Sequence, residues 1–314
     1  MKILFTYAAL VVLTPTFYGQ SQPVREKPHR EVAVTFDDLP ATNTVLSQMT
    51  SITVNLLWTL KKHSIPAVGF VNEGKLNVPG ENEARTELLR QWLDAGLEIG
   101  NHTFSHVSID RVPYRAYEDD LIRGETITKA LLLEKGKQLR YFRHPQLRTG
   151  PTREYKKSLD SLLAARNYTV APVTIDNNEY LFAALYSKAK TRNDSTIMSS
   201  IVREYVLYME TVFRHFERLS TSFLGYEVKQ ILLLHANELN ADHFEDIVTM
   251  VKNRGYRFIS LEHALKDPAY RLPEARSKRG LSWLHRWRLA QGKPVEPEPH
   301  VPVYITKLLR TYDP

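Results

Sequence analysis

Cysteine is absent from this 314-residue chain, and its absence narrows the possible chemistry considerably. Without thiols the protein forms no disulfide, offers no thiolate ligand to a metal and has no cysteine nucleophile. It also has no N-terminal cysteine that could carry a lipid. Any metal ion must therefore be bound by oxygen and nitrogen atoms.

Long apolar runs are scarce as well, and the clearest one lies at the start of the chain. Residues 3–13 form a predominantly apolar run directly after Lys2. Because a helix that spans a bilayer needs about 20 apolar residues, this shorter run indicates a signal peptide at residues 1–21. An uncleaved N-terminal anchor is the alternative. We therefore expect an exported protein that is periplasmic or extracellular.

Glycine-rich loops are missing, and the excess of positive charge is confined to one segment. None of the predicted strands is followed by a glycine-rich phosphate loop, which counts against a nucleotide-binding fold. The net charge is +7, but residues 271–293 alone contain seven Lys or Arg residues against the single acid Glu274. The rest of the chain is nearly neutral, so nucleic acid is not an expected partner.

Short apolar runs alternate with longer amphipathic segments over most of the chain. We expect strands at residues 31–36, 67–71, 97–100, 141–143, 168–175, 229–234 and 256–261, and helices at residues 43–62, 82–95, 114–134, 153–166, 199–219 and 242–253. This alternation predicts an α/β fold, a distorted (β/α) barrel of about seven parallel strands, although a doubly wound sheet would give the same pattern. The barrel is assigned to residues 30–268 and a C-terminal extension to residues 269–314.

Charged and imidazole side chains gather where five of the predicted strands end. In chain order they are Asp37 and Asp38, His102 and His106, Arg143, Asp176 and Glu179, and His235. Parallel strands bring their carboxyl ends to one edge of a sheet or barrel, where active sites are found. We therefore expect these side chains to share one site.

Three of these side chains form a candidate metal site. Asp38, His102 and His106 would supply one oxygen and two nitrogen ligands and leave a coordination position open, as in catalytic zinc sites. Two histidines four residues apart can meet one metal from one face of a helical turn, although most such pairs bind nothing. The neighbouring Asp37 should point away from Asp38 and toward a substrate. His235, from another strand, could donate a proton.

The ordered set of motifs resembles the polysaccharide deacetylases of carbohydrate esterase family 4, the NodB homology domain. The five motifs are residues 35–38, 102–106, 143–145, 176–180 and 233–235, and the resemblance covers about residues 31–265. It implies a distorted barrel of about seven strands. It also implies that Asp38, His102 and His106 bind Zn²⁺ or another divalent ion such as Co²⁺, which polarises an acetamide carbonyl and lowers the pKa of a water.

The same resemblance assigns roles to the remaining motif residues. Asp37 is the general base, held by Arg143, and His235 is the general acid. An acidic residue of the fourth motif orients His235 and raises its pKa; Glu179 fits that position best and Asp176 is the second choice. The backbone N–H of Gln146 is expected in the oxyanion hole, and Pro145 and Tyr180 are expected in the substrate cleft.

Several residues depart from the family pattern, and they leave the substrate open. Leu39 and Pro40 replace the usual glycine after the aspartates, Gln146 and Leu147 replace an aromatic residue and a glycine, and Glu179 precedes Tyr180 where aspartate and tryptophan are commoner. We expect N-deacetylation of an N-acetylglucosamine-containing glycan, such as chitin or peptidoglycan. The alternatives are O-acetyl ester hydrolysis on acetylated xylan, hydrolysis of a small amide, and a non-catalytic glycan-binding module.

The basic segment, residues 271–293, also holds Trp283 and Trp287 at helical spacing. This pattern predicts a short amphipathic helix packed on the barrel with a solvated basic face. The alternative is that the segment binds an anionic envelope polymer or membrane surface. Residues 295–314 are rich in proline and are expected to be extended.

Overall fold

The computed structural model describes residues 30–312, so the predicted signal peptide at residues 1–21 lies outside the described residues. The strands are β1 (Arg30–Leu39), β2 (Ala67–Val71), β3 (Glu98–Asn101), β4 (Tyr141–Phe142), β5 (Thr169–Val170), β6 (Gln230–His235) and β7 (Tyr256–Phe258). The α-helices are α1 (Leu46–Lys62), α2 (Asn82–Asp94), α3 (Tyr114–Arg123), α4 (Thr126–Glu134), α5 (Arg153–Ala165), α6 (Glu179–Thr191), α7 (Ser195–Leu224), α8 (Glu238–Asn253), α9 (Leu261–Ala264), α10 (Trp283–Ala290) and α11 (Val303–Thr311). Short 3-10 helices are η1 (Glu73–Leu76), η2 (Pro145–Leu147) and η3 (Pro268–Arg271).

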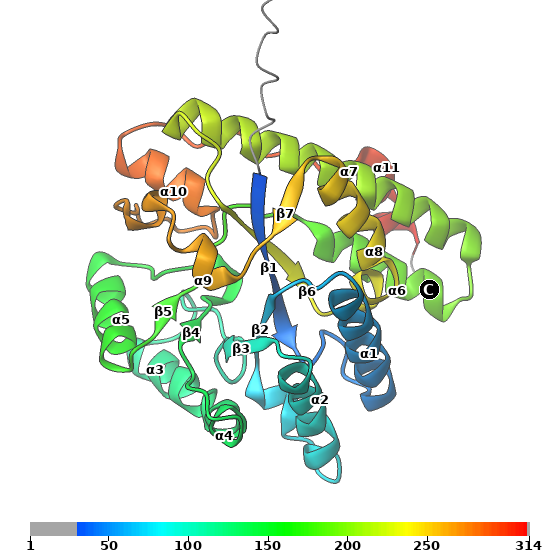
Figure 1. Ribbon diagram of the computed structural model, residues 1–314, viewed down its shortest axis with the longest axis horizontal. Helices are drawn as coiled ribbons and strands as arrows, with labels where there is room; N and C mark the ends of the chain where they lie inside the picture. The colour runs from blue at the N-terminus through cyan, green and yellow to red at the C-terminus, as the bar shows by residue number, and fades with distance from the viewer. Residues whose placement is uncertain (1–29, 313–314) are drawn as a thin grey trace, which may run out of the picture.

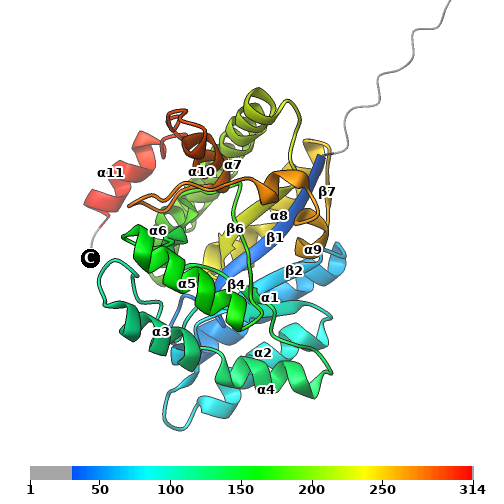
Figure 2. The ribbon, with the colours of Figure 1, turned by 90° about the vertical axis from the view of Figure 1, so that its left-hand side faces the viewer.

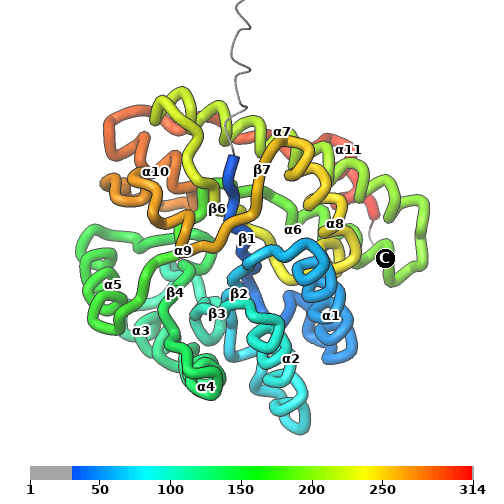
Figure 3. Tube along the Cα trace, viewed as in Figure 1, coloured from blue at the N-terminus to red at the C-terminus, as the bar shows by residue number. Residues whose placement is uncertain are grey.

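The strands form one parallel sheet in the order β5-β4-β3-β2-β1-β6, and β7 also pairs with β1. Figures 1 and 3 show β1 in the middle of the molecule with helices around it. The segment after β5 closes the arrangement: Ala171 N donates to Phe142 O in β4, and Ile175 forms a bridge to Leu232 in β6. One stretch of chain thus contacts both ends of the sheet, and the predicted distorted barrel is confirmed.

Alternate residues of β1 face opposite sides of the sheet, as the two-residue period of a strand requires. Phe36 points to the helices, where its ring centroid lies 5.9 Å from that of Trp92 and 5.3 Å from that of Phe244. Burial of such a ring is worth about 1.5–3 kcal/mol and holds the strand firmly in register. Thr35 and Asp37 consequently point to the barrel interior, where Arg143 contacts both of them.

The structure differs from the prediction in several segments, of which three contain a helix boundary or a helix that was not predicted. The helix expected over residues 114–134 is two helices, because the Glu73 carboxylate accepts hydrogen bonds from Ile127 N and Thr128 N and so caps a new helix start at α4. Helix α6 was not predicted at all. The segment expected to be extended, residues 295–314, contains α11, whose Ile305 is fully buried.

The C-terminal extension packs against the barrel. Figure 2 shows α10 and α11 on the side of α6 and α7. The predicted amphipathic helix is confirmed as α10, in which Trp283, Leu284 and Trp287 are buried. No helix among residues 30–312 is both long enough and apolar enough to cross a bilayer.

Candidate active site

A cavity of about 860 Å³ opens at the carboxyl ends of the strands. Its lining includes most of the residues expected to carry chemistry: Asp37, Asp38, His102, His106, Gln146, Asp176, Tyr180 and His235. Arg143, Pro145 and Glu179 are buried behind this lining. The parallel strands therefore bring together residues that lie nearly 200 positions apart in the sequence.

Asp37 and Asp38 point in different directions because the backbone changes conformation between them. Asp37 is the last residue of β1 in register with β6, opposite His235. Asp38 has a left-handed backbone with φ of 70°, a conformation that aspartate tolerates better than most residues. The Asp37 carboxylate faces Arg143, whereas Asp38 Oδ1 lies 3.8 Å from His106 Nε2.

The loop after β3 brings its two histidines toward Asp38. Residues 102–106 form a loop rather than the helical turn suggested by their spacing, because Asn101 Oδ1 accepts from Thr103 N and Thr103 Oγ1 accepts from His106 N. The ring centroids of His102 and His106 are 4.9 Å apart. Ligand atoms of Asp38, His102 and His106 all lie within 4.8 Å of one another, the one such group of three among residues 30–312.

The chemistry of these donors fits a divalent cation. His102 Nδ1 lies 2.8 Å from the Arg143 carbonyl oxygen. Since a carbonyl can only accept, the proton is on Nδ1 and Nε2 keeps its lone pair for a metal. Burial lowers the pKa of His102 to about 4 and that of His106 to about 4, so both rings are neutral at pH 7, the form that binds metal.

Lys75, in η1, is a neighbour of this site that sequence reasoning missed. Its ammonium donates to the carbonyl oxygens of Asp38 and Ala41 and lies 3.6 Å from Asp38 Oδ1. Burial alone would raise the pKa of Asp38, but Lys75 and the nearby imidazoles hold it well below its ordinary value. No spacing pattern connects Lys75 to the motifs, because it reaches the site from the segment after β2.

Asp37 is a buried carboxyl with a fixed orientation. Arg143 Nη1 donates to Asp37 Oδ1 at 3.3 Å, and Arg143 Nη2 donates to Thr35 Oγ1 at 2.9 Å. The guanidinium carbon also lies 4.6 Å from the centroid of the Phe70 ring. Burial raises the pKa of Asp37, and Arg143 opposes that rise. A carboxyl whose pKa is above its ordinary value is a better proton acceptor at neutral pH.

His235, at the end of β6, is paired with Glu179, the first residue of α6. Glu179 Oε1 accepts from His235 N at 2.8 Å and lies 3.3 Å from His235 Nδ1. Asn237 and Asn240 also donate to this carboxylate, and neither was singled out from the sequence. Burial alone would lower the pKa of His235, but the carboxylates of Glu179, Asp38 and Asp37, with Glu179 first, together outweigh burial and raise the pKa to about 9.

The other expected site residues lie around this centre. The Asp176 carboxylate accepts from Asn177 N, and burial, followed by the nearby Glu298, raises its pKa to about 7. Tyr180 and Gln146 are exposed on the cavity wall. Pro145 is buried and begins η2, so it shapes the backbone of the wall rather than its surface.

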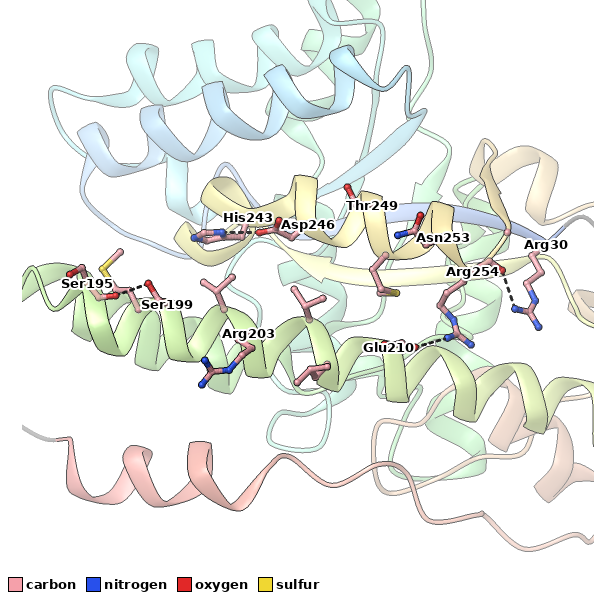
Figure 4. Close-up of a pocket in the computed structure, with 16 residues that line it drawn as sticks. Arg30, Ser195, Ser199, Arg203, Glu210, His243, Asp246, Thr249, Asn253 and Arg254 are labelled. Carbon is pink, nitrogen blue, oxygen red and sulfur yellow. Dashed lines mark hydrogen bonds and ion pairs between the residues drawn. The ribbon is translucent and has the colours of Figure 1, made fainter.

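A second hollow, of about 1220 Å³, lies between α7 and α8 and shares no lining residue with the first (Figure 4). Two ion pairs lie within its lining: Arg254 with Glu210 at 3.3 Å, and His243 with Asp246 at 3.1 Å. This groove is the larger of the two, but it does not contain the cluster of Asp38, His102 and His106. We therefore place the candidate active site at the strand ends.

Residues 24–170 match the sequence profile of the polysaccharide deacetylase family. A peptidoglycan-N-acetylglucosamine deacetylase of Bacillus cereus is 23% identical over 235 residues, which cover 74% of this chain and 66% of that protein, just under two thirds of its length. A solved peptidoglycan deacetylase of Bacillus subtilis is 21% identical, with 76% of this chain and 93% of that chain covered and a TM-score of 0.48. A carbohydrate esterase family 4 pseudoenzyme of Bacillus anthracis is 15% identical, with 76% and 66% covered and a TM-score of 0.48.

Proposed function

We propose that the chain is a metal-dependent hydrolase of the polysaccharide deacetylase family, which its residues 24–170 match, and that it removes N-acetyl groups from an N-acetylglucosamine-containing glycan. The relative from Bacillus cereus is named for peptidoglycan, which favours a cell-wall glycan as substrate and an exported location. The observation that carries the proposal is the convergence of two neutral imidazoles and a carboxylate beside a buried carboxyl and a Glu-paired histidine.

The metal would be held by Asp38, His102 and His106. A divalent ion such as Zn²⁺ or Co²⁺ bound there would polarise the acetamide carbonyl and lower the pKa of a water molecule. The remaining steps belong to side chains of the chain. Asp37, oriented by Arg143, takes the proton of the attacking water as the new C–O bond forms.

Two further groups act on the substrate: one stabilises the oxyanion, and the other protonates the leaving nitrogen. The Gln146 N–H faces the oxyanion that develops on the carbonyl oxygen of the substrate. His235, protonated at neutral pH because of Glu179, gives its proton to the sugar nitrogen as the C–N bond breaks. The products are acetate, which keeps the oxygen of the water, and a free amine, which receives the proton from His235.

Acetate release by the purified full-length protein tests this function. The substrates are chitin oligomers, peptidoglycan and acetylxylan, each with and without a chelator. We expect chelator-sensitive acetate release from one of the two N-acetylated glycans. Release from acetylxylan alone would identify an O-acetyl esterase. No acetate from any substrate by metal-loaded protein would contradict the proposal and leave the small-amide and glycan-binding alternatives.

A further inference from the structure

The basic C-terminal extension reaches the cavity wall, and one of its arginines points inward. Arg286, in α10, is fully buried. Its Nη2 donates to Leu147 O at 2.6 Å and its Nη1 to Thr149 Oγ1 at 3.2 Å. The guanidinium therefore holds both ends of residues 147–149. It also donates to two carbonyls of the extension, Ala275 and Leu281.

The loop that Arg286 holds has an unusual backbone. Gln146 and Leu147 are consecutive residues with φ of 55° and 53°, in the left-handed region that side chains disfavour. Such conformations persist only where the surrounding structure imposes them, and they cluster at functional sites. Gln146 is also the residue whose N–H is assigned to the oxyanion. A constraint on this loop is therefore a constraint on the chemistry.

A second contact from the extension fixes the same loop from another direction. A Cβ on Gly280 would lie 2.1 Å from the Gln146 carbonyl oxygen, so only glycine allows the two backbones to approach so closely. Two further bonds tie the extension to the strand segment before Asp176: Ser282 Oγ donates to Thr174 O, and Trp283 N donates to Val173 O, both at 2.7 Å. The extension thus contacts two of the cavity's loops.

Simple packing does not account for a guanidinium at this position. Burying a charged group is costly unless it is well bonded, and an apolar side chain would pack α10 against the barrel without that cost. What the guanidinium adds is a planar set of donors that reaches several acceptors at once, a geometry that lysine cannot reproduce.

We propose that Arg286 is a positioning residue of the active site, which holds residues 145–149 so that the Gln146 N–H faces the developing oxyanion. This inference rests on the proposed function. It gives the extension a role inside the barrel, distinct from the solvated basic face expected from its charge. Arg286 acts through the loop and does not itself touch the substrate.

The test compares Arg286→Met with Arg279→Met, a matched control at an exposed position of the same segment. Because a misplacement of about 1 Å costs roughly 100-fold in rate, we expect kcat of Arg286→Met to fall by about that factor while KM stays within about threefold. Arg286→Lys should recover only part of the rate. Arg279→Met should match the wild type. Zinc affinity of the metal-free protein should be unchanged in all three variants.

A second variant and a second measurement separate positioning from damage to the fold. Gly280→Ala keeps Arg286 but forces the Gln146 carbonyl to move, and it should show the same loss of kcat. Hydrogen–deuterium exchange should rise at residues 144–149 in Arg286→Met and not in the control. A folded Arg286→Met protein with wild-type kcat, or with unchanged exchange in this loop, would overturn the inference. If the wild type itself releases no acetate, the proposed function fails, and the exchange measurement alone decides whether Arg286 holds the loop.

Discussion

Replacement of Glu179 by glutamine should shift the pH range over which the enzyme works. The pKa of His235 rises from its ordinary value of 6.5 to about 9, because Glu179, followed by Asp38 and Asp37, outweighs the effect of burial. That rise corresponds to roughly 3.5 kcal/mol of preference for the imidazolium, at about 1.4 kcal/mol for each pKa unit. Glutamine keeps the shape and loses the charge, so the pKa should fall toward 6.5, with Asp38 and Asp37 as the carboxylates that still raise it.

The kinetic consequence follows from the role of His235 as an acid. The wild type should lose activity as the pH rises through about 9, because the imidazolium is then deprotonated. At pH 8 about 90% of His235 is protonated in the wild type, against about 3% in Glu179→Gln if its pKa falls all the way to 6.5, so kcat should differ by up to roughly 30-fold. At pH 5.5 both forms are protonated, and the two rates should approach each other.

Stability should follow the same titration. A histidine whose pKa is raised on folding stabilises the native state fully below its unfolded pKa, near 6.5, and this stabilisation is lost as the pH rises through about 9. The pH-dependent part of the destabilisation in Glu179→Gln should therefore be present at pH 6 and absent above pH 9. Thermal unfolding across this range measures it.

The assay is acetate release from pH 5 to pH 10, with NMR titration of the His235 ring in metal-free protein. Asp176→Asn is the matched control, since it removes the other candidate carboxylate without touching the pair of His235 and Glu179. We expect its alkaline limb to stay close to that of the wild type. An alkaline limb in Glu179→Gln that coincides with the wild type would refute this reasoning, and a shift in Asp176→Asn instead would exchange the two roles.

Three further outcomes are expected. Asp37→Asn should abolish turnover while zinc binding, measured by isothermal titration calorimetry, is retained; loss of zinc instead would mean that Asp37 and Asp38 have exchanged roles. His106→Ala should lose most of its zinc affinity and its activity together, because three ligands become two; tight zinc binding by this variant would place the metal elsewhere. Replacing three exposed basic residues of the extension, Arg271, Lys278 and Arg279, by glutamine should leave binding to isolated cell walls and its salt dependence unchanged. A salt-sensitive loss of binding would instead support an anionic envelope partner.

The strand pattern predicted most of the barrel because it depends on local rules. Buried parallel strands appear as short apolar runs, and the polar residues that follow them lie at the carboxyl edge. Asp37, Asp38 and His235 were placed in one site on that basis, and the structure brings them together. The break between α3 and α4 could not be predicted in this way, because the cap that begins α4 comes from Glu73, more than 50 residues earlier.

The candidate active site was likewise predictable in part from the sequence and in part not. The chain without cysteine required oxygen and nitrogen ligands, and the motif order predicted which residues would supply them. The spacing of His102 and His106 suggested a helical turn, whereas hydrogen bonds of Asn101 and Thr103 impose a loop that still brings the rings together. Residue type and order were therefore sufficient to select the candidate donors, but they did not predict the path of the backbone that brings these side chains together.

The sequence by itself determined the alternation of parallel strands with helices and the set of reactive groups, since strand periodicity and strand-end position are properties of neighbouring residues. Only the tertiary structure decided which neighbours set the pKa values and the positions of those groups. Lys75 lies beside Asp38 from 37 residues away, and Arg286 holds Leu147 from 139 residues away. Such contacts form when distant segments pack, and no local pattern encodes them. The basic extension shows the difference most clearly. Its charge predicted a solvated basic face, whereas the structure buries Arg286 against the loop at Leu147 in the active-site wall.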